Sequence, residues 1–464
     1  MTIAEAQKRI VEVGVRQVVE EAIARAKVDS KHAVLEVIES RSLARADEID
    51  ARLKKGESVG RLAGVPFLAK DNILTFDSKT TASSHMLENF EAPYQATVIE
   101  KLEAEGAICI GKTNLDAFAH GGSTENSYFG PTKNVTDDER VAGGSSGGSA
   151  VAVAAGIVPF ALGSDTGGSI REPASFNGVV GLKPTYGSVS RYGVVAMASS
   201  TDVVGPITTT VDDARLILDI IKGVDARDST TIDILPLEKA SKKLRIGVIQ
   251  QCFGEGVDAD VDSVTHQAIE TLRSAGHSVE EVDLPTFRHA LAVYYIVVPA
   301  ELTSNLARYD GIKYGMQKDG ANLTEVYEAS RSAGFMDENK RRILIGNYVL
   351  SSGYYDAYYR KAQTVRTLII NEFNEAFKQH DVLLSPTAPT PAFRLGENTD
   401  DPLQMYLADM MTVPPSLAGV SAISVPAGES VSGLPIGIQF VAPMRRDDIV
   451  LNMAETWEEL YAKR

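Results

Sequence analysis

The sequence Gly163-Ser164-Asp165-Thr166-Gly167-Gly168-Ser169-Ile170-Arg171 follows a short apolar run, and a second glycine–serine cluster, GGSSGGS at residues 143–149, precedes that run. Between the two clusters, residues 150–155 predict a tightly packed helix and residues 157–162 predict a buried strand. Short strands and helices that alternate along a chain, joined by loops, indicate an α/β layered fold.

The same alternation continues on both sides of this stretch. Residues 1–55 have the helical spacing of apolar residues, in two segments divided near residue 29. Further strands are expected at residues 63–69, 107–110, 244–249, 381–384, 421–426 and 435–441, and helices at 97–106, 261–275, most of 300–380 and from 447 onward. We therefore expect a mixed central sheet that lies between helical layers.

One large domain over residues 1–464 is the expected organisation. Residues 1–60 would form a helical lead-in, and residues 61–230 would hold the core with both glycine–serine clusters. Residues 231–464 would supply the remainder of the sheet and of the substrate pocket. The mostly polar residues 228–243, which include Pro236, indicate a linker or a surface excursion.

Composition excludes several classes of function. The formal net charge is −16 without a run of five or six like charges, so the chain alone is a poor candidate for binding nucleic-acid phosphates. The two cysteines lie far apart and no Cys/His cluster has zinc-site spacing, so no metal is expected. The N-terminal residues are charged throughout, which argues against a signal peptide and favours a cytoplasmic location. Residues 141–164 carry no charge, but they are rich in Gly and Ser and contain Pro159, which argues against a membrane span.

Two interpretations compete for the glycine–serine clusters. A phosphate-binding loop needs a Lys-Ser or Lys-Thr pair that closes the loop onto a helix, and neither cluster has one. A serine nucleophile fits better, because the turn Thr166-Gly167-Gly168-Ser169 offers successive unobstructed backbone N–H groups, as an oxyanion hole requires. A lone cluster of this kind would merely serve a turn, so the prediction depends on a base for the serine.

Lys70 is the candidate base. The seven histidines lie in no recognisable triad context. A lysine replaces histidine in some triads if it is held neutral. Lys70 follows the apolar run 63–69, where burial would lower the pKa of its ammonium group. Since most lysines are solvated, this position by itself is a weak argument.

Together these residues resemble the amidase signature family. The motifs that carry the resemblance are residues 64–66 with 70–72, residues 143–150 and residues 163–171; Lys70 precedes Ser145 by 75 residues, and Ser145 precedes Ser169 by 24. The resemblance implies a Ser–Ser–Lys triad in which Ser169 is the nucleophile and Lys70 the ultimate base. Ser145, entered through a cis peptide bond from Gly144, would relay the proton. The implied oxyanion hole consists of the amides of Thr166, Gly167, Gly168 and Ser169.

Within this family the chain is similar to the glutaminase subunits of tRNA-dependent amidotransferases. The similarity runs nearly end to end and includes residues 111–114, 123–127, 129–134, 304–311, 341–343, 350–356 and 406–409. It implies that Arg342 binds the α-carboxylate of glutamine and Asp409 its ammonium group, since a zwitterion needs one charge of each sign. Tyr294 or Tyr295 would line the pocket, and Arg341 is an adjacent competitor for the role of Arg342.

Three other residues near these motifs have open roles. Asp165 and Arg171 flank the nucleophile turn, either as substrate contacts or as a structural ion pair. His120 stands where such glutaminase subunits usually carry methionine, which bears on substrate preference and on the response to pH.

The resemblance also implies partners. The chain would hydrolyse glutamine through a seryl ester and supply ammonia within a heterotrimer that includes the B and C subunits of the amidotransferase. Misacylated Glu-tRNA(Gln) or Asp-tRNA(Asn) would bind mainly through the B subunit, and ATP and Mg²⁺ would belong to that partner, with no cofactor in this chain. Two alternatives are a stand-alone amidase for another carboxamide, which should lack the Arg342–Asp409 pair, and an inactive scaffold, which the complete triad disfavours.

Overall fold

The computed structural model describes residues 1–240, 242–399 and 401–463, and in these residues one mixed sheet of eleven strands has the order β1-β3-β2-β4-β6-β5-β10-β11-β9-β7-β8. Its strands are β1 (Val34–Val37), β2 (Pro66–Lys70), β3 (Ile108–Thr113), β4 (Phe160–Asp165), β5 (Val180–Lys183), β6 (Val203–Thr208), β7 (Arg245–Ile249), β8 (Ser278–Val282), β9 (Val382–Pro386), β10 (Ser421–Glu429) and β11 (Pro435–Ala442). The predicted α/β fold with a mixed central sheet is confirmed.

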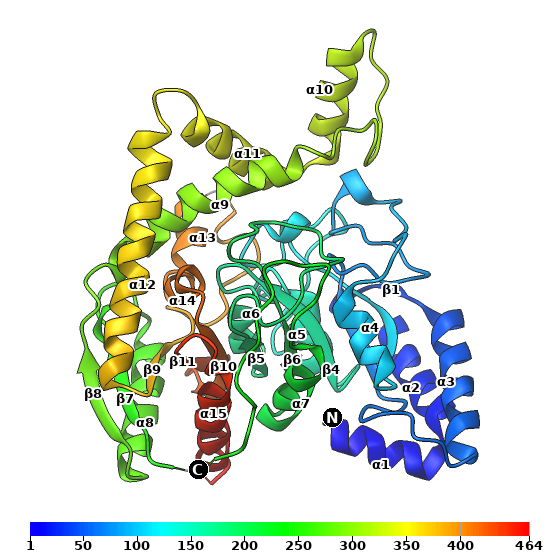
Figure 1. The fold of residues 1–464 in the computed structure, drawn as a ribbon, viewed down its shortest axis with the longest axis horizontal. Coiled ribbons are helices and arrows are strands. Elements are labelled where there is room, and N and C mark those ends of the chain that lie inside the picture. Colours follow the sequence, from blue (N-terminus) through cyan, green and yellow to red (C-terminus); the bar gives the residue numbers. More distant parts are fainter. Residues whose placement is uncertain (241, 400, 464) are drawn as a thin grey trace.

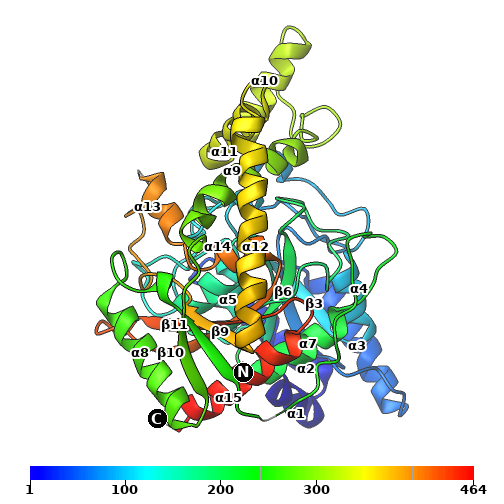
Figure 2. The same cartoon turned by 60° about the vertical axis from the view of Figure 1, so that its left-hand side comes forward.

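Helices surround this sheet (Figure 1). They are α1 (Ile3–Val13), α2 (Val15–Lys27), α3 (Glu39–Lys54), α4 (Thr97–Ala104), α5 (Gly147–Ala154), α6 (Arg171–Phe176), α7 (Val211–Ile221), α8 (Ala259–Ser274), α9 (Ala290–Leu306), α10 (Leu323–Gly334), α11 (Asp337–Leu350), α12 (Lys361–Gln379), α13 (Pro402–Leu407), α14 (Val413–Ala418) and α15 (Asp447–Tyr461). Helix α12 stands along one side of the molecule, and α10 projects from the end opposite both termini (Figures 1 and 2).

The N-terminal region shows how the sequence selects these elements. Helix α2 buries Val15, Val18 and Ala22, whose spacing of three and four residues places them on one face. Gly14, with φ of 91°, separates α1 from α2, and its N–H bonds the carbonyl oxygen of Ile10.

The helical lead-in expected at residues 1–60 differs from the structure, because it contains the edge strand β1. The residues of β1 are mainly Val and Leu, which favour strands, and β1 pairs antiparallel with β3. The sequence pattern also missed β5, β6 and β8. Pro206 in β6 argues against a strand, but β5 pairs with β6 only at Thr208 and Ile207, so Pro206 needs no donor on that side.

The topology brings the two predicted halves of the catalytic site together. Strands β2 and β4 are parallel neighbours, with Phe67 opposite Phe160 and Ala69 opposite Leu162. Their carboxyl ends therefore lie at the same edge of the sheet, where Lys70 ends β2 and the glycine-rich turn follows β4.

None of the helices in the described ranges has the length and apolar character needed to cross a membrane.

Candidate active site

The ammonium group of Lys70 lies buried among serines. Its Nζ is 2.7 Å from Ser145 Oγ, 2.8 Å from Ser146 Oγ and 3.2 Å from the carbonyl oxygen of Ser164. Burial lowers the pKa of Lys70 to about 7, although three nearby carboxylates oppose the shift. A lysine with this pKa is substantially neutral near pH 7, so it can accept a proton.

Ser145 and Ser146 approach Lys70 from the loop directly before α5. The Gly144–Ser145 peptide bond is cis, as the family resemblance implied. The N–H of Ser146 donates to the carbonyl oxygen of Ser169 at 3.1 Å, which ties this loop to the nucleophile turn. The structure thus brings Lys70, both loop serines and Ser169 into one site.

Ser169 is 8% exposed, and its hydroxyl forms no hydrogen bond with any described residue. The first link of the predicted relay, from Ser145 to Lys70, is therefore in place, while the nucleophile stays free for a substrate. Likewise, in the described part of the chain no acceptor faces the N–H groups of the four predicted oxyanion-hole residues, Thr166, Gly167, Gly168 and Ser169. Free amides on one turn suit the negative oxygen of a tetrahedral intermediate.

Close packing requires the two glycines of this turn. A Cβ at Gly167 would lie 2.7 Å from the ring of Tyr294 in α9. Gly168 has φ of 148° and faces the side chain of Thr412, so it lacks both the space and the backbone conformation for a side chain. Tyr294 therefore shapes the nucleophile turn.

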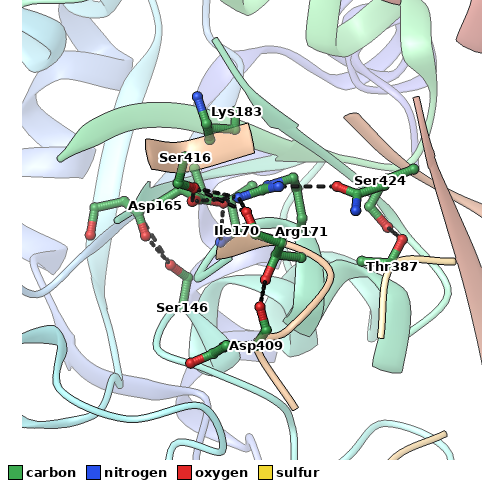
Figure 3. A network of polar contacts seen from close by, with 12 residues as sticks. Ser146, Asp165, Ile170, Arg171, Lys183, Thr387, Asp409, Ser416 and Ser424 are labelled. Atoms are coloured by element: carbon green, nitrogen blue, oxygen red, sulfur yellow. Dashed lines mark hydrogen bonds and ion pairs between the residues drawn. The ribbon is translucent and has the colours of Figure 1, made fainter. Parts of the chain in front are cut away.

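Asp165 and Arg171 form a buried ion pair behind the turn (Figure 3). Arg171 Nε and Nη2 each lie 3.0 Å from a carboxylate oxygen of Asp165. The remaining donors of Arg171 reach Gln439, Ser416 and the carbonyl oxygen of Thr412, so all three of its nitrogens have partners. Of the two roles that the sequence leaves open, this geometry favours the structural ion pair over the substrate contact.

Arg342 is the more deeply buried of the two adjacent arginines. The side chain of Arg342 is 4% exposed, whereas that of Arg341 is 44% exposed. Arg342 Nε donates to Glu338 at 2.7 Å, and its guanidinium lies over the rings of Tyr295 and Tyr406. Among the described residues no acceptor contacts its two terminal nitrogens, which leaves a guanidinium edge for a carboxylate.

Asp409 is the nearby anion. The hydroxyl of Tyr295 donates to its Oδ2 at 3.3 Å, so Tyr295 contacts both predicted ends of the substrate site. Burial raises the pKa of Asp409 to about 7, although the Arg342 charge opposes this. A second buried carboxyl, Glu172, accepts from the Gly144 N–H through Oε2, while its Oε1 has no partner in the described residues.

A cavity of about 450 Å³ adjoins these groups. Its lining comes from residues 116–126, from the start of α11 with both Arg341 and Arg342, and from residues 398–406. Asp116 lines the cavity and also lies near the catalytic centre, since its negative charge raises the pKa of Lys70 and so opposes the effect of burial. Asp409 lies just behind the lining, since a Cβ at Gly122 would be 3.8 Å from its Oδ1.

Sequence reasoning missed several residues of this site. Ser146 belongs to the quoted cluster, but nothing in the cluster separates its role from that of Ser145. Glu338 could have been found, because it precedes Arg342 by one helical turn on α11. Glu172 and Asn339 reach the site through contacts distant in sequence and give no local signal.

Across residues 1–240, 242–399 and 401–463 no group of three or more His, Cys, Asp or Glu side chains is arranged to hold a metal ion.

Comparisons with known proteins agree with this geometry. The family model described as Amidase matches residues 17–451. The A subunit of glutamyl-tRNA(Gln) amidotransferase from Thermosynechococcus vestitus is 52% identical over 435 residues, which cover 92% of this chain and 90% of that protein. The protein of the same name from Prochlorococcus marinus (strain MIT 9303) is 52% identical over 471 residues, with 99% and 97% covered. The crystal structure of the same kind of protein from Thermotoga maritima is similar with a TM-score of 0.80 and 40% identity, covering 98% of this chain and 93% of that one.

Proposed function

This chain belongs to the amidase family, and we propose that it is the glutamine-hydrolysing subunit of a tRNA-dependent amidotransferase. Relatives 52% identical to it over nearly their whole length are named as the A subunits of glutamyl-tRNA(Gln) amidotransferases. The single observation that carries the proposal is that the nucleophile turn packs against Tyr294, whose ring neighbour Tyr295 contacts both Arg342 and Asp409.

The two charges fit the two ends of glutamine. The free guanidinium edge of Arg342 binds the α-carboxylate, and Asp409 binds the α-ammonium group. Tyr295 holds both, because its ring lies under the guanidinium and its hydroxyl bonds the carboxylate. Such a clamp fixes the substrate backbone and orients the side-chain amide toward Ser169.

Acylation begins when Ser169 Oγ attacks the amide carbon of glutamine. Its proton passes to Ser145 Oγ, whose own proton passes to the neutral amine of Lys70, 2.7 Å from that oxygen. The N–H groups of Thr166, Gly167, Gly168 and Ser169 form the oxyanion hole for the resulting intermediate.

Collapse of this intermediate breaks the C–N bond. The proton held by Lys70 returns through Ser145 to the leaving nitrogen, so ammonia departs and a γ-glutamyl ester remains on Ser169. A water molecule then attacks the ester with the same relay as base. The products are glutamate, ammonia and the free serine.

The ammonia serves a second reaction in the assembled enzyme. We assign this chain to a heterotrimer with the B and C subunits of the amidotransferase, in which misacylated Glu-tRNA(Gln) or Asp-tRNA(Asn) binds mainly to the B subunit. That partner also takes ATP and Mg²⁺ to activate the carboxylate. The net charge of −16 supports this division, because an acidic chain is poorly suited to hold tRNA phosphates by itself.

Acid quenching during turnover tests the proposal. The full chain, alone and assembled with its partner subunits, is mixed with glutamine, quenched with acid and digested. The masses of its peptides are then measured by mass spectrometry. We expect a γ-glutamyl adduct on the peptide with Ser169, and its absence from the Ser169→Ala variant. An adduct on another residue would refute the assignment of the nucleophile.

A second assay separates a glutaminase of an amidotransferase from a stand-alone amidase. Its readout is kcat/KM for ammonia release from glutamine and from a simple amide without charges. Because the Arg342–Asp409 clamp acts only on a zwitterion, we expect a strong preference for glutamine. Equal values would favour the stand-alone amidase.

A further inference from the structure

His120 occupies the cavity wall beside Arg342 without an assigned role. Its side chain is fully buried, it lines the cavity, and its Nε2 has no partner in the described residues. An unpartnered buried ring nitrogen is costly, because it has lost its water without gaining a protein partner. The ligand of the cavity is the natural candidate to supply the missing partner.

The contacts of Asn339 in α11 determine whether Nε2 of His120 is a hydrogen-bond donor or an acceptor. Asn339 Oδ1 accepts from the backbone N–H of Met336 at 3.2 Å, and Nδ2 donates to the carbonyl oxygen of Ala117 at 2.8 Å. Both partners are backbone groups of fixed polarity, so the orientation of the amide is determined.

The same Nδ2 lies 2.6 Å from His120 Nδ1. Because Nδ2 only donates, Nδ1 of His120 must accept, and the ring proton of the neutral imidazole therefore resides on Nε2. The unpartnered atom is a hydrogen-bond donor.

The ring is held neutral. Burial lowers the pKa of His120 well below its usual value, and the positive charge of Arg342 lowers it further. His120 and Arg342 both line this cavity, and they lie close enough for the Arg342 charge to act on the imidazole. Two side chains with unused donors in one cavity wall favour an acceptor group of negative charge.

We propose that His120 is a second ligand of the substrate α-carboxylate, which accepts from His120 Nε2–H and from Arg342 together. Asn339 is the positioning residue that fixes the tautomer. This inference rests on the proposed function and deepens it, since it assigns the carboxylate subsite to two side chains.

The test compares glutamine with two analogues on the full chain in its assembled form. Glutaramic acid keeps the carboxylate but lacks the ammonium group, and γ-aminobutyramide keeps the ammonium group but lacks the carboxylate. In His120→Met, kcat/KM should fall roughly tenfold to a hundredfold for glutamine and glutaramic acid, the range for a lost hydrogen bond to a charged group. The rate on γ-aminobutyramide should stay near the wild-type value, and His120→Gln, which restores an N–H donor, should recover part of the loss.

His277 provides the matched control. It is also buried, its Nδ1 accepts from the N–H of Leu244 at 3.2 Å, and its Nε2 also has no partner among the described residues. It lies beside β8 and does not line the cavity. His277→Met should therefore leave the ratios among the three substrates unchanged.

Three outcomes are informative. Equal losses of His120→Met on all three substrates would overturn the inference, because His120 would then support only the fold. A wild-type enzyme that does not prefer glutamine over both analogues would instead refute the proposed function. ¹⁵N spectra of labelled histidine, assigned with His120→Met, should show the Nε2–H tautomer for His120; the Nδ1–H form would also overturn the inference.

Discussion

The catalytic centre around Lys70 and the cavity around Arg342 differ in how their polar groups are satisfied. Lys70 has three hydrogen-bond partners, and the Asp165–Arg171 pair behind it is complete. Beside the cavity, His120 Nε2 has no partner among the described residues. The base and the ion pair behind it have protein partners before a substrate binds, whereas the cavity leaves a donor that a ligand can complete.

This difference separates chemistry from recognition. A network that is satisfied before substrate arrives is preorganised, so it acts on any amide that reaches Ser169. Unpaired charges and donors instead reward only a ligand with matching groups, and they penalise one without them. Changes in the two regions should consequently be distinguished by the substrates they affect.

The largest expected effect comes from Ser169→Ala. Loss of the nucleophile should lower ammonia release from glutamine and from γ-aminobutyramide by the same factor, on the order of 10⁴-fold or more. Initial rates on both substrates, with circular dichroism to verify the fold, provide the measurement. A loss confined to glutamine would contradict the distinction between the two regions, because Ser169 would then contribute to substrate recognition and not to the chemical step.

Lys70→Arg should be nearly as damaging as Lys70→Ala. A guanidinium keeps its proton in proteins, so it cannot act as base, and turnover should fall about 10²- to 10⁴-fold on every substrate. Lys183→Met is the matched control, since burial also lowers the pKa of Lys183 to about 7 but its Nζ hydrogen-bonds, among the described residues, only the carbonyl oxygens of Pro184 and Val420. This variant should lower the melting temperature and retain kcat. Near-normal turnover by Lys70→Arg would show that only a fixed charge is needed.

Asp409→Asn should affect one end of the substrate only. We expect kcat/KM to fall about a hundredfold for glutamine and γ-aminobutyramide, because their ammonium group loses a buried partner. Glutaramic acid lacks that group and should be nearly unaffected. Arg342→Met should show the complementary pattern, with glutaramic acid impaired and γ-aminobutyramide spared.

Arg341→Ala is the control for the arginine, because the two residues are adjacent and line the same cavity, but the side chain of Arg341 is 44% exposed. Its kinetic constants should match those of the wild type. Similar losses from both arginine variants would mean that charge near α11, and not a specific contact, attracts the substrate.

The smallest effect is a difference in pH dependence. Lys70, with its pKa lowered to about 7, accepts a proton only when neutral, so activity falls as pH falls below 7. Asp409, with its pKa raised to about 7, loses its charge over the same range and with it the attraction for an ammonium group. For glutamine the two losses multiply, and log kcat/KM should approach a slope of about 2 in acid, against about 1 for glutaramic acid.

The carboxyl of Asp116, whose pKa burial also raises to about 7, acts on both substrates alike and cancels from this difference. Asp409→Asn should reduce the slope for glutamine to that for glutaramic acid. Equal slopes in the wild type would show that Asp409 does not contact the ammonium group.

The fold was predictable where apolar runs are short and buried. Strands β2, β4, β7 and β9 meet this condition, and the pattern found them. Strand β8 lies at the sheet edge with mostly polar, exposed residues, so it has no apolar signal. The short edge strand β1 was not predicted, because helical sequence patterns precede and follow it.

The candidate site was predictable to the level of motifs. Spacing and residue type identify Lys70, Ser145 and Ser169, because a serine nucleophile needs a base and an oxyanion turn. Sequence cannot choose between Arg341 and Arg342, since that choice depends on which face of α11 packs inward. Contacts such as that between Asn339 and His120, 219 residues apart, exist only in the folded chain.

The tight packing of Gly167 against Tyr294 has a consequence for how activity is acquired during folding. The nucleophile turn belongs to the first half of the chain, while α9 and Thr412, which shape it, belong to the second. A chain interrupted before α9 would contain the whole triad but would lack Tyr294 and Thr412, against which the turn packs. We therefore expect glutamine hydrolysis to begin only after the second half of the chain has folded against this turn.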